Sequence, residues 1–284
     1  MTTKAERELI EKSRLEEMKS FDFEKADGFE YLIGVDEVGR GPLAGPVVAC
    51  AVIMPKDWDV PGINDSKKLT EKRREELAFK IKDKSVGLGL GFVNSKKIDR
   101  FNIRNATKMA MIIAVRRCIE NLKNNLEDSS AGTDVDESDG NFDVNSMPVE
   151  NMRLGGAEDK VLGEGLNSDV SKGRIKILID GDMEIPLEKF EPEFDQYSVS
   201  ICQETVVKGD SQSLSIGAAS IVAKVARDEF MKEYSKRAPE FGFDKHKGYG
   251  TKAHYKAISS YGLSPIHRKT FLKKVLDKME EELI

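Results

Sequence analysis

The chain has 284 residues, a net charge of −5 and 39% hydrophobic residues, which is enough to bury the core of one or two domains. Its longest apolar run, Val47 to Met54, has eight residues, whereas a membrane-spanning helix needs roughly 18, and the charged N-terminus does not resemble a signal peptide. Three widely spaced cysteines exclude a disulfide framework and a cysteine-based zinc site, and they favour a cytoplasmic location.

Charge is distributed unevenly along the sequence. Residues 124–172 contain twelve Asp or Glu against three Lys or Arg, so the rest of the chain carries a net charge of +4. Residues 245–274 contain eight Lys or Arg, all three histidines and no carboxylate. Such a basic stripe is typical of a surface that binds nucleic acid, although an ordinary solvated surface has the same composition.

The first 122 residues read as alternating helices and strands. Helices are predicted over residues 1–28, 65–81 and 103–122, and strands over 31–35, 46–54 and 86–93. The first helix is expected to dock on the core of its own chain, and binding to a partner is the alternative. The glycines of residues 86–93 predict a close approach of another backbone to that strand.

Composition changes at residues 124–172, which are rich in Asp, Glu, Ser, Gly and Asn. We expect a disordered surface insertion here. The alternative is an acidic mimic of a nucleic-acid strand that occupies the basic surface. Beyond it the pattern predicts a strand over 175–179, an acidic loop over 182–196, a strand over 197–207, and helices over 211–234 and 269–282. The whole order favours an α/β fold with a mixed sheet flanked by helices and a helical C-terminal segment.

Carboxylates follow two of the buried strands. Asp36 and Glu37 end the strand that starts at Tyr31, and Asp180 ends the strand over 175–179. Asp210 precedes a helix rich in small residues. Neighbouring residues of a strand point to opposite faces, so we expect a bend at Val38–Gly39 to bring Asp36 and Glu37 to one centre. Capping of turns is the alternative role for such acids.

Four carboxylates at one point would repel each other unless cations neutralise them. Oxygen ligands alone select hard ions, here Mg²⁺ or Mn²⁺. Two such ions, roughly 3.5–4 Å apart, would clamp the attacking and leaving oxygens of a phosphodiester. This mechanism predicts activity that rises with pH and is lost on chelation.

The run Gly34-Val35-Asp36-Glu37-Val38-Gly39-Arg40-Gly41-Pro42-Leu43-Ala44-Gly45-Pro46 closely resembles the signature of type 2 ribonuclease H, the bacterial ribonuclease HII family. Further stretches match that family in order. They are Asn64–Leu69, Ile103–Ala114, Ile179–Gly181, Lys208–Asp210, Ala218–Asp228 and His246–Thr251. Several independent motifs in the family's order make the resemblance specific, and it covers most of residues 29–123 and 173–272.

The resemblance implies a monomeric endoribonuclease with a ribonuclease-H-like fold. Such an enzyme cuts the RNA strand of RNA–DNA hybrids and cuts 5′ of single ribonucleotides in duplex DNA, leaving a 3′-hydroxyl and a 5′-phosphate. It would remove misincorporated ribonucleotides and RNA primers. The implied domains are a helical extension (1–28), a catalytic domain (29–230) and a basic helical C-terminal segment (231–284).

The resemblance also assigns residues to roles. The catalytic and metal-binding carboxylates fall on Asp36, Glu37, Asp180 and Asp210. The turn that senses the ribose 2′-hydroxyl falls on Gly39, Arg40 and Gly41, and the 2′-hydroxyl is what distinguishes RNA from DNA. The tyrosine that packs on the following deoxyribose falls on Tyr249.

Some positions keep alternatives. The 30 residues between Asp180 and Asp210 exceed the usual bacterial spacing, so Asp182, Glu184 and Asp228 compete for the fourth ligand position. For Asp228, a structural ion pair is the favoured role. Lys67, Lys68 and Lys224 are candidate phosphate contacts, and Lys224 has the alternative of pairing with a nearby carboxylate. His246, His254 and His267 are expected at the surface or in turns rather than as metal ligands.

Two other functions compete with this interpretation. Ribonuclease HIII is expected to have Gly-Lys-Gly and an N-terminal substrate-binding domain, whereas this chain has Arg40 and a short N-terminal helix. A nucleic-acid-binding module without activity is disfavoured because all four carboxylates are retained.

Overall fold

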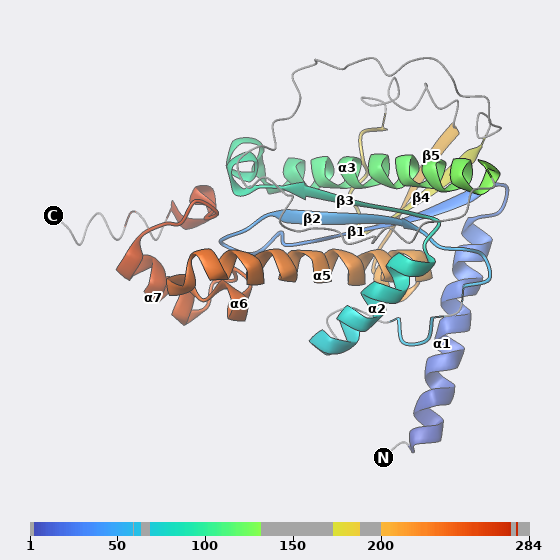
Figure 1. Cartoon of the computed structure of the whole chain (residues 1–284), viewed down its shortest axis with the longest axis horizontal. Coiled ribbons are helices and arrows are strands. Elements are labelled where there is room, and N and C mark those ends of the chain that lie inside the picture. The colour runs from blue at the N-terminus through green and yellow to red at the C-terminus, as the bar shows by residue number, and fades with distance from the viewer. Residues whose placement is uncertain are drawn as a thin grey trace.

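The structure is a computed structural model that describes residues 3–58, 60–63, 69–131, 173–187, 200–273 and 277. A five-stranded mixed sheet lies at its centre (Figure 1). The strands are β1 (Tyr31–Val38), β2 (Val47–Ile53), β3 (Gly87–Val93), β4 (Arg174–Asp180) and β5 (Ser200–Val206). Their order is β3-β2-β1-β4-β5, with β2 antiparallel to β1 and β3, and β4 parallel to β1 and β5. The predicted mixed α/β sheet is confirmed.

Helices cover both faces of this sheet (Figure 1). Those described are α1 (Lys4–Lys25), α2 (Glu71–Lys84), α3 (Ser95–Ala131), α5 (Leu214–Arg237), α6 (Phe243–His246) and α7 (Lys252–Tyr261), with 3₁₀ turns η4 (Gly209–Ser211) and η5 (Pro239–Phe241). Val35 and Ala49 belong to the core under α3, whereas Val48 and Cys50 belong to the core under α2 and α5. This alternation is the one expected of a sheet buried on both faces.

Helix α3 packs closely on β3, as the glycines of that strand predicted. A Cβ on Gly91 would lie 1.9 Å from the carbonyl oxygen of Ala110. Helix α3 begins earlier than predicted, because a helical segment from Ser95 joins the predicted helix across a kink at Asn102, whose φ is +64°. It also runs on to Ala131, so the expectation of an irregular insertion from residue 124 is wrong for residues 124–131. Residues 132–172 lie outside the described part of the chain.

Helix α1 docks on the core of its own chain, as predicted. Leu15 and Met18 are buried against the layer that contains α5. The carboxylate of Asp22 accepts hydrogen bonds from the amide (2.8 Å) and hydroxyl (2.7 Å) of Ser215 in the first turn of α5. A carboxylate at that position satisfies amides that a helix N-terminus leaves unpaired. The helical extension therefore stabilises the start of α5.

The C-terminal part is helical, and α7 and the short α6 and η5 were not predicted. Residues 269–273 are helical, while most of the predicted helix over 269–282 lies outside the described residues. Helix α5 continues past residue 230, the predicted end of the catalytic domain, and the division into domains stays a prediction. Among the described residues, no helix has the length and apolar character needed to cross a membrane.

Candidate active site

Two carboxylates lie side by side at the ends of the central parallel strands. The register of β1 and β4 pairs Val35 with Ile179, so Asp36 and Asp180 follow at the same level of the sheet. Asp36 is buried, and its carboxylate is hydrogen bonded by the hydroxyl of Ser220 in α5. Two residues distant in sequence are thus brought together by strand pairing, with α5 covering them.

Glu37 reaches the same site from the end of the regular strand. Strand β1 keeps its pairing with β2 through Val38, and the chain turns only at Gly39, whose φ is +92°. The turn thus lies at the predicted position but follows both acids, so Asp36 and Glu37 themselves stay within the regular strand. Glu37 lies at the strand end, where its Oε1 is 3.3 Å from Nη1 of Arg40.

The acids repel each other in this setting. Burial raises the pKa of Asp36 well above its ordinary value, and the charges of Glu37 and Asp180 raise it further. Burial also raises the pKa of Glu37, which the charge of Asp180 reinforces and that of Arg40 opposes. An opposite charge among these three carboxylates would relieve the repulsion.

Asp210 is next to Asp180 through its main chain. Lys208 adopts a left-handed conformation (φ +57°) that starts the η4 turn. The turn directs the amides of Gly209 and Asp210 at Oδ1 of Asp180, at 2.6 and 3.4 Å. The fourth predicted carboxylate thus belongs to a residue in contact with the third.

Within the described ranges, no three His, Cys, Asp or Glu side chains are already arranged as a metal site. Here the carboxylate of Glu37 contacts Arg40, and that of Asp180 accepts from two amides. In chemistry the set nevertheless fits a divalent cation. Its donors are all carboxylate oxygens, and the mutual repulsion of three of them is what such an ion would neutralise.

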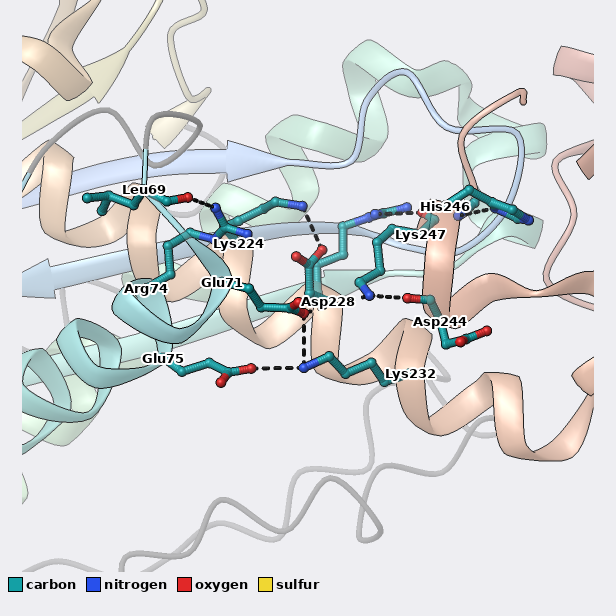
Figure 2. A network of polar contacts seen from close by, with 12 residues as sticks. Leu69, Glu71, Arg74, Glu75, Lys224, Asp228, Lys232, Asp244, His246 and Lys247 are labelled. Carbon is teal, nitrogen blue, oxygen red and sulfur yellow. Dashed lines mark hydrogen bonds and ion pairs between the residues drawn. The ribbon is translucent and has the colours of Figure 1, made fainter. Parts of the chain in front are cut away.

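The competing carboxylates lie in different surroundings. Asp182 and Glu184 are exposed in the loop after β4. Asp228 forms an ion pair with Lys224, Nζ to Oδ1 at 2.7 Å, one turn apart on α5 (Figure 2). The predicted structural ion pair of Asp228 is confirmed, and so is the alternative that Lys224 pairs with a carboxylate. Lys67 and Lys68 lie outside the described residues.

Two buried arginines hold the loop between β1 and β2. Arg227 of α5 donates to the carbonyls of Ala44 (3.1 Å), Pro46 (3.0 Å) and Lys247 (3.0 Å). Arg268 donates to the carbonyls of Gly39 (2.6 Å), Arg40 (3.0 Å) and Gly45 (3.0 and 2.8 Å). Both side chains are fully buried, and burial lowers the pKa of Arg227 to about 10 and that of Arg268 to about 9.

Glycine is required at the start of this loop. Besides its positive φ, Gly39 leaves no room for a side chain, because a Cβ there would lie 2.3 Å from Nε of Arg227. Arg40 and Gly41 are exposed on the outer side of the loop. A Cβ on Gly41 would lie 3.9 Å from Cε1 of Tyr249, so the half-exposed tyrosine ring borders the turn. The structure thus brings Gly39, Gly41 and Tyr249 together.

Two of the three histidines, His254 and His267, form a buried series of hydrogen bonds instead of lying at the surface. His254 and His267 are 0% and 3% exposed, so the expectation of surface or turn positions is wrong for both. Nδ1 of His267 accepts from the amide of Ser264 at 2.8 Å, and its Nε2 lies 3.0 Å from Nε2 of His254. Nδ1 of His254 is 2.9 Å from the carbonyl of Tyr249. With both rings neutral, each of these hydrogen bonds has one donor and one acceptor. The series holds the segment that carries Tyr249 in place.

Sequence reasoning missed Arg227 and Arg268 as parts of this site. Arg268 belongs by composition to the basic stripe, whereas it is buried and bonded to the loop. For Arg227 the sequence did contain a signal, because a cation that follows the mostly small and apolar residues Ala218–Ala226 needs acceptors from elsewhere. Charge counting alone does not separate such residues from solvated lysines.

The chain is similar in sequence to proteins named ribonuclease HII. The ribonuclease HII family model matches residues 33–126 and 116–274. Ribonuclease HII of Clostridioides difficile (strain 630) is 41% identical over 267 residues, which is 94% of this chain and 80% of that protein. Ribonuclease HII of Acetivibrio thermocellus is 40% identical over 249 residues, covering 88% of this chain and 72% of that protein.

Solved structures share the fold at lower identity. Ribonuclease H2 from Pyrococcus horikoshii OT3 superposes with a TM-score of 0.56 at 21% identity, over 88% of this chain and 99% of that one. Bst-RNase HIII in complex with Mn²⁺ gives 0.52 at 19% identity, over 90% of this chain and 73% of that one. Both comparisons show that the fold is shared.

Proposed function

The chain belongs to the ribonuclease HII family and is a ribonuclease H, an endonuclease that acts on RNA–DNA, and we propose that its acidic site cuts both RNA–DNA hybrids and single ribonucleotides embedded in duplex DNA. Cleavage would fall 5′ of the ribonucleotide and leave a 3′-hydroxyl and a 5′-phosphate. Its role would be to remove misincorporated ribonucleotides and RNA primers. The enzyme would work as a monomer in the cytoplasm.

The observation that carries this proposal is the pairing of Asp36 with Asp180 beside the Gly39–Gly41 turn. Asp36 is a buried acid with a raised pKa, which is unfavourable by itself, so its position at a strand end beside an exposed turn supports a ligand-binding role. The partner that relieves the repulsion is a divalent cation, and the oxygen donors favour Mg²⁺ or Mn²⁺. The Mn²⁺ complex of Bst-RNase HIII, a neighbour in fold, is in keeping with this choice.

Asp36, Glu37, Asp180 and Asp210 would hold two divalent ions. When bound, such ions lower the pKa of a coordinated water and stabilise the charge that develops on a phosphodiester. Ser220 keeps the carboxylate of Asp36 oriented. The amides of Gly209 and Asp210 do the same for Asp180.

The other residues would select the substrate. The exposed main chain of Arg40 and Gly41 is accessible to a ribose, and a 2′-hydroxyl both donates and accepts hydrogen bonds. The ring of Tyr249 borders the same turn and would pack on the next sugar. Lys67 and Lys224 would contact phosphates, Lys224 after exchanging its bond to Asp228 for one to the backbone of the substrate.

A nicking assay tests the proposed substrate. The labelled duplex carries one ribonucleotide, and an all-DNA duplex of the same sequence is the control. With Mg²⁺ or Mn²⁺ we expect one cut 5′ of the ribonucleotide, and no cut in EDTA. Cleavage of a hybrid without cleavage of the single ribonucleotide would favour the specificity expected of ribonuclease HIII. Normal turnover in EDTA would contradict the metal mechanism.

A matched pair of variants tests the fourth carboxylate. We expect Asp210→Asn to lower kcat/KM about 10²-fold or more, since it removes a proposed metal ligand. Asp228→Asn breaks an ion pair on the same side of the sheet and should retain most of the activity. The opposite order of the two effects would transfer the metal-binding role from Asp210 to Asp228.

A further inference from the structure

Arg268 faces the inner side of the Gly39–Gly41 turn. Its guanidinium donates to the carbonyl oxygens of Gly39 and Arg40, and Nε together with Nη2 donates to that of Gly45. None of these partners is a carboxylate. The cation is therefore solvated by peptide dipoles, and it fixes the direction of each peptide group that it binds.

The direction of those carbonyls determines where the amides point. In a trans peptide the C=O of one residue and the N–H of the next are antiparallel, and no described peptide bond is cis. Because the carbonyls of Gly39 and Arg40 point inward to Arg268, the N–H groups of Arg40 and Gly41 point outward. Both of these residues are exposed, whereas Gly39 is buried.

The residues that carry the outward amides follow the acidic cluster in sequence and border the tyrosine ring. On one side, Glu37 is three residues before Arg40, and its Oε1 lies 3.3 Å from Nη1 of the Arg40 side chain. On the other, Tyr249 borders Gly41. A sugar placed between the carboxylates and the ring would meet these two N–H groups, which are the donors that an additional hydroxyl needs.

From this geometry we propose that Arg268 is a positioning residue for ribose recognition: it holds two peptide groups of the Gly39–Gly41 turn so that their amides face the 2′-hydroxyl. This inference rests on the proposed function of the turn. It assigns the discrimination between ribose and deoxyribose to the main chain and the control of that main chain to one buried cation.

Arg227 supplies a matched control within the same loop. It is equally buried and packs against Gly39, and it also bonds three carbonyls. These carbonyls belong to Ala44, Pro46 and Lys247, so Arg227 bonds neither of the two peptide groups whose amides face outward. Lysine in place of either arginine keeps the charge and loses the planar fork that spans several carbonyls. Both variants would loosen the loop in general. Only Arg268→Lys would also misdirect the amides of Arg40 and Gly41.

The test measures binding by fluorescence anisotropy, with Ca²⁺ in place of Mg²⁺ and intact substrate verified on a gel. Each variant is titrated with a duplex that has one ribonucleotide and with the all-DNA duplex. The ratio of the two Kd values cancels any inactive fraction. We expect Arg268→Lys to reduce this ratio about five- to tenfold, the effect of one or two hydrogen bonds, and Arg227→Lys to retain it.

Other outcomes overturn the inference. If Arg268→Lys keeps the wild-type ratio, or if both variants lose it equally, Arg268 does not set the recognition. If the wild-type protein itself does not distinguish the two duplexes, the proposed function of the turn fails, and the inference fails with it.

A second measurement needs no substitution. Hydrogen exchange of the wild-type protein, followed by NMR, should show the amides of Arg40 and Gly41 exchanging rapidly in the free protein. The ribonucleotide duplex should protect both, and the all-DNA duplex should not. Amides that are already protected in the free protein would contradict the outward orientation.

Discussion

The acidic cluster at the ends of β1 and β4 and the arginine-held loop beside it both bury charges of one sign, but they satisfy them differently. Asp36 is bonded by Ser220 and by the amide of Glu37, yet two further carboxylates act on it. Arg268 directs four hydrogen bonds at carbonyl oxygens. The hydrogen bonds of the buried arginine are thus complete without a ligand, whereas the carboxylates still repel each other, and a bound cation would relieve that repulsion.

The largest effect is expected from Asp36→Asn. In the folded protein the pKa of Asp36 is raised by burial and by its acidic neighbours, so its ionised form opposes folding, and this destabilisation grows as pH rises above the carboxyl's ordinary pKa. The amide removes that charge. We expect kcat/KM to fall about 10³-fold, equivalent to about 4 kcal/mol, while the metal-free protein gains on the order of 1 kcal/mol, or about 2–4 °C in Tm.

Thermal unfolding at pH 7 in EDTA, beside the nicking assay, measures both quantities. Asp228→Asn serves as the control, because Asp228 has Lys224 as its partner and its loss should not raise Tm. A lower Tm for Asp36→Asn would mean that the cluster is not destabilising. The contrast with the arginine-held loop would then disappear.

A smaller effect, on stability, is expected from His267→Gln, in the region of the buried arginines. Burial, together with His254, lowers the pKa of His267 to about 4, and the pKa of His254 is lowered as well. The unfolded chain binds a proton near pH 6.5, and the folded chain does not until about pH 4. The stability that His267 contributes is therefore complete above pH 6.5 and is lost as pH falls towards 4.

The variant loses the bonds to Ser264 and His254, which is expected to destabilise the protein by about 1–2 kcal/mol at pH 7. Urea unfolding of both proteins between pH 4.5 and 7.5 isolates the contribution of His267 together with its coupling to His254, because the titrations of distant groups cancel in the difference. The difference should shrink as pH falls. A difference that is constant with pH would show that His267 is protonated in the folded protein as readily as in the unfolded chain. That result would contradict the expectation that a region with two buried cations, Arg227 and Arg268, disfavours a third.

Much of the acidic cluster could be predicted from the sequence. Apolar runs that end in Asp36 and Asp180 indicate strands with carboxylates at one edge, and the pairing of β1 with β4 follows that expectation. The predicted turn at Gly39 is present, but it follows Asp36 and Glu37, which stay within the regular strand. Side-chain alternation along β1 can be read from sequence, whereas the effect of Asp180 on Glu37 depends on the neighbouring strand β4.

The arginine side could not be predicted in the same way. Arg268 and His267 belong to a basic, polar stretch whose composition predicts a surface. Arg268 is buried because carbonyls of a loop more than 200 residues earlier accept its hydrogen bonds, whereas the ring of His267 is buried against Ser264 and His254. The bonds of Arg268 involve the main chain, which has the same chemistry at every position. No residue type marks Gly39 or Gly45 as the acceptor.

The smallest effect on stability is expected from the loss of a partly exposed ion pair. In the network of Figure 2, Lys232 of α5 lies 3.1 Å from Glu71 and 2.8 Å from Glu75, both on α2. These side chains are 39–50% exposed, so water and salt weaken the attraction. Lys232→Ala should therefore destabilise the protein by only about 0.5 kcal/mol, and by less in 1 M salt.

Lys224→Ala is the matched comparison for Lys232→Ala, because its partner Asp228 is only 8% exposed and would be left unpaired. We expect a loss of about 1–3 kcal/mol that salt reduces little, measured by the same urea unfolding at 0.1 and 1 M NaCl. Equal losses for the two lysines would mean that burial does not separate them. In that case a buried carboxylate that loses its partner would cost no more stability than an exposed one. The contrast between the acidic cluster and the buried arginines would then not extend to stability.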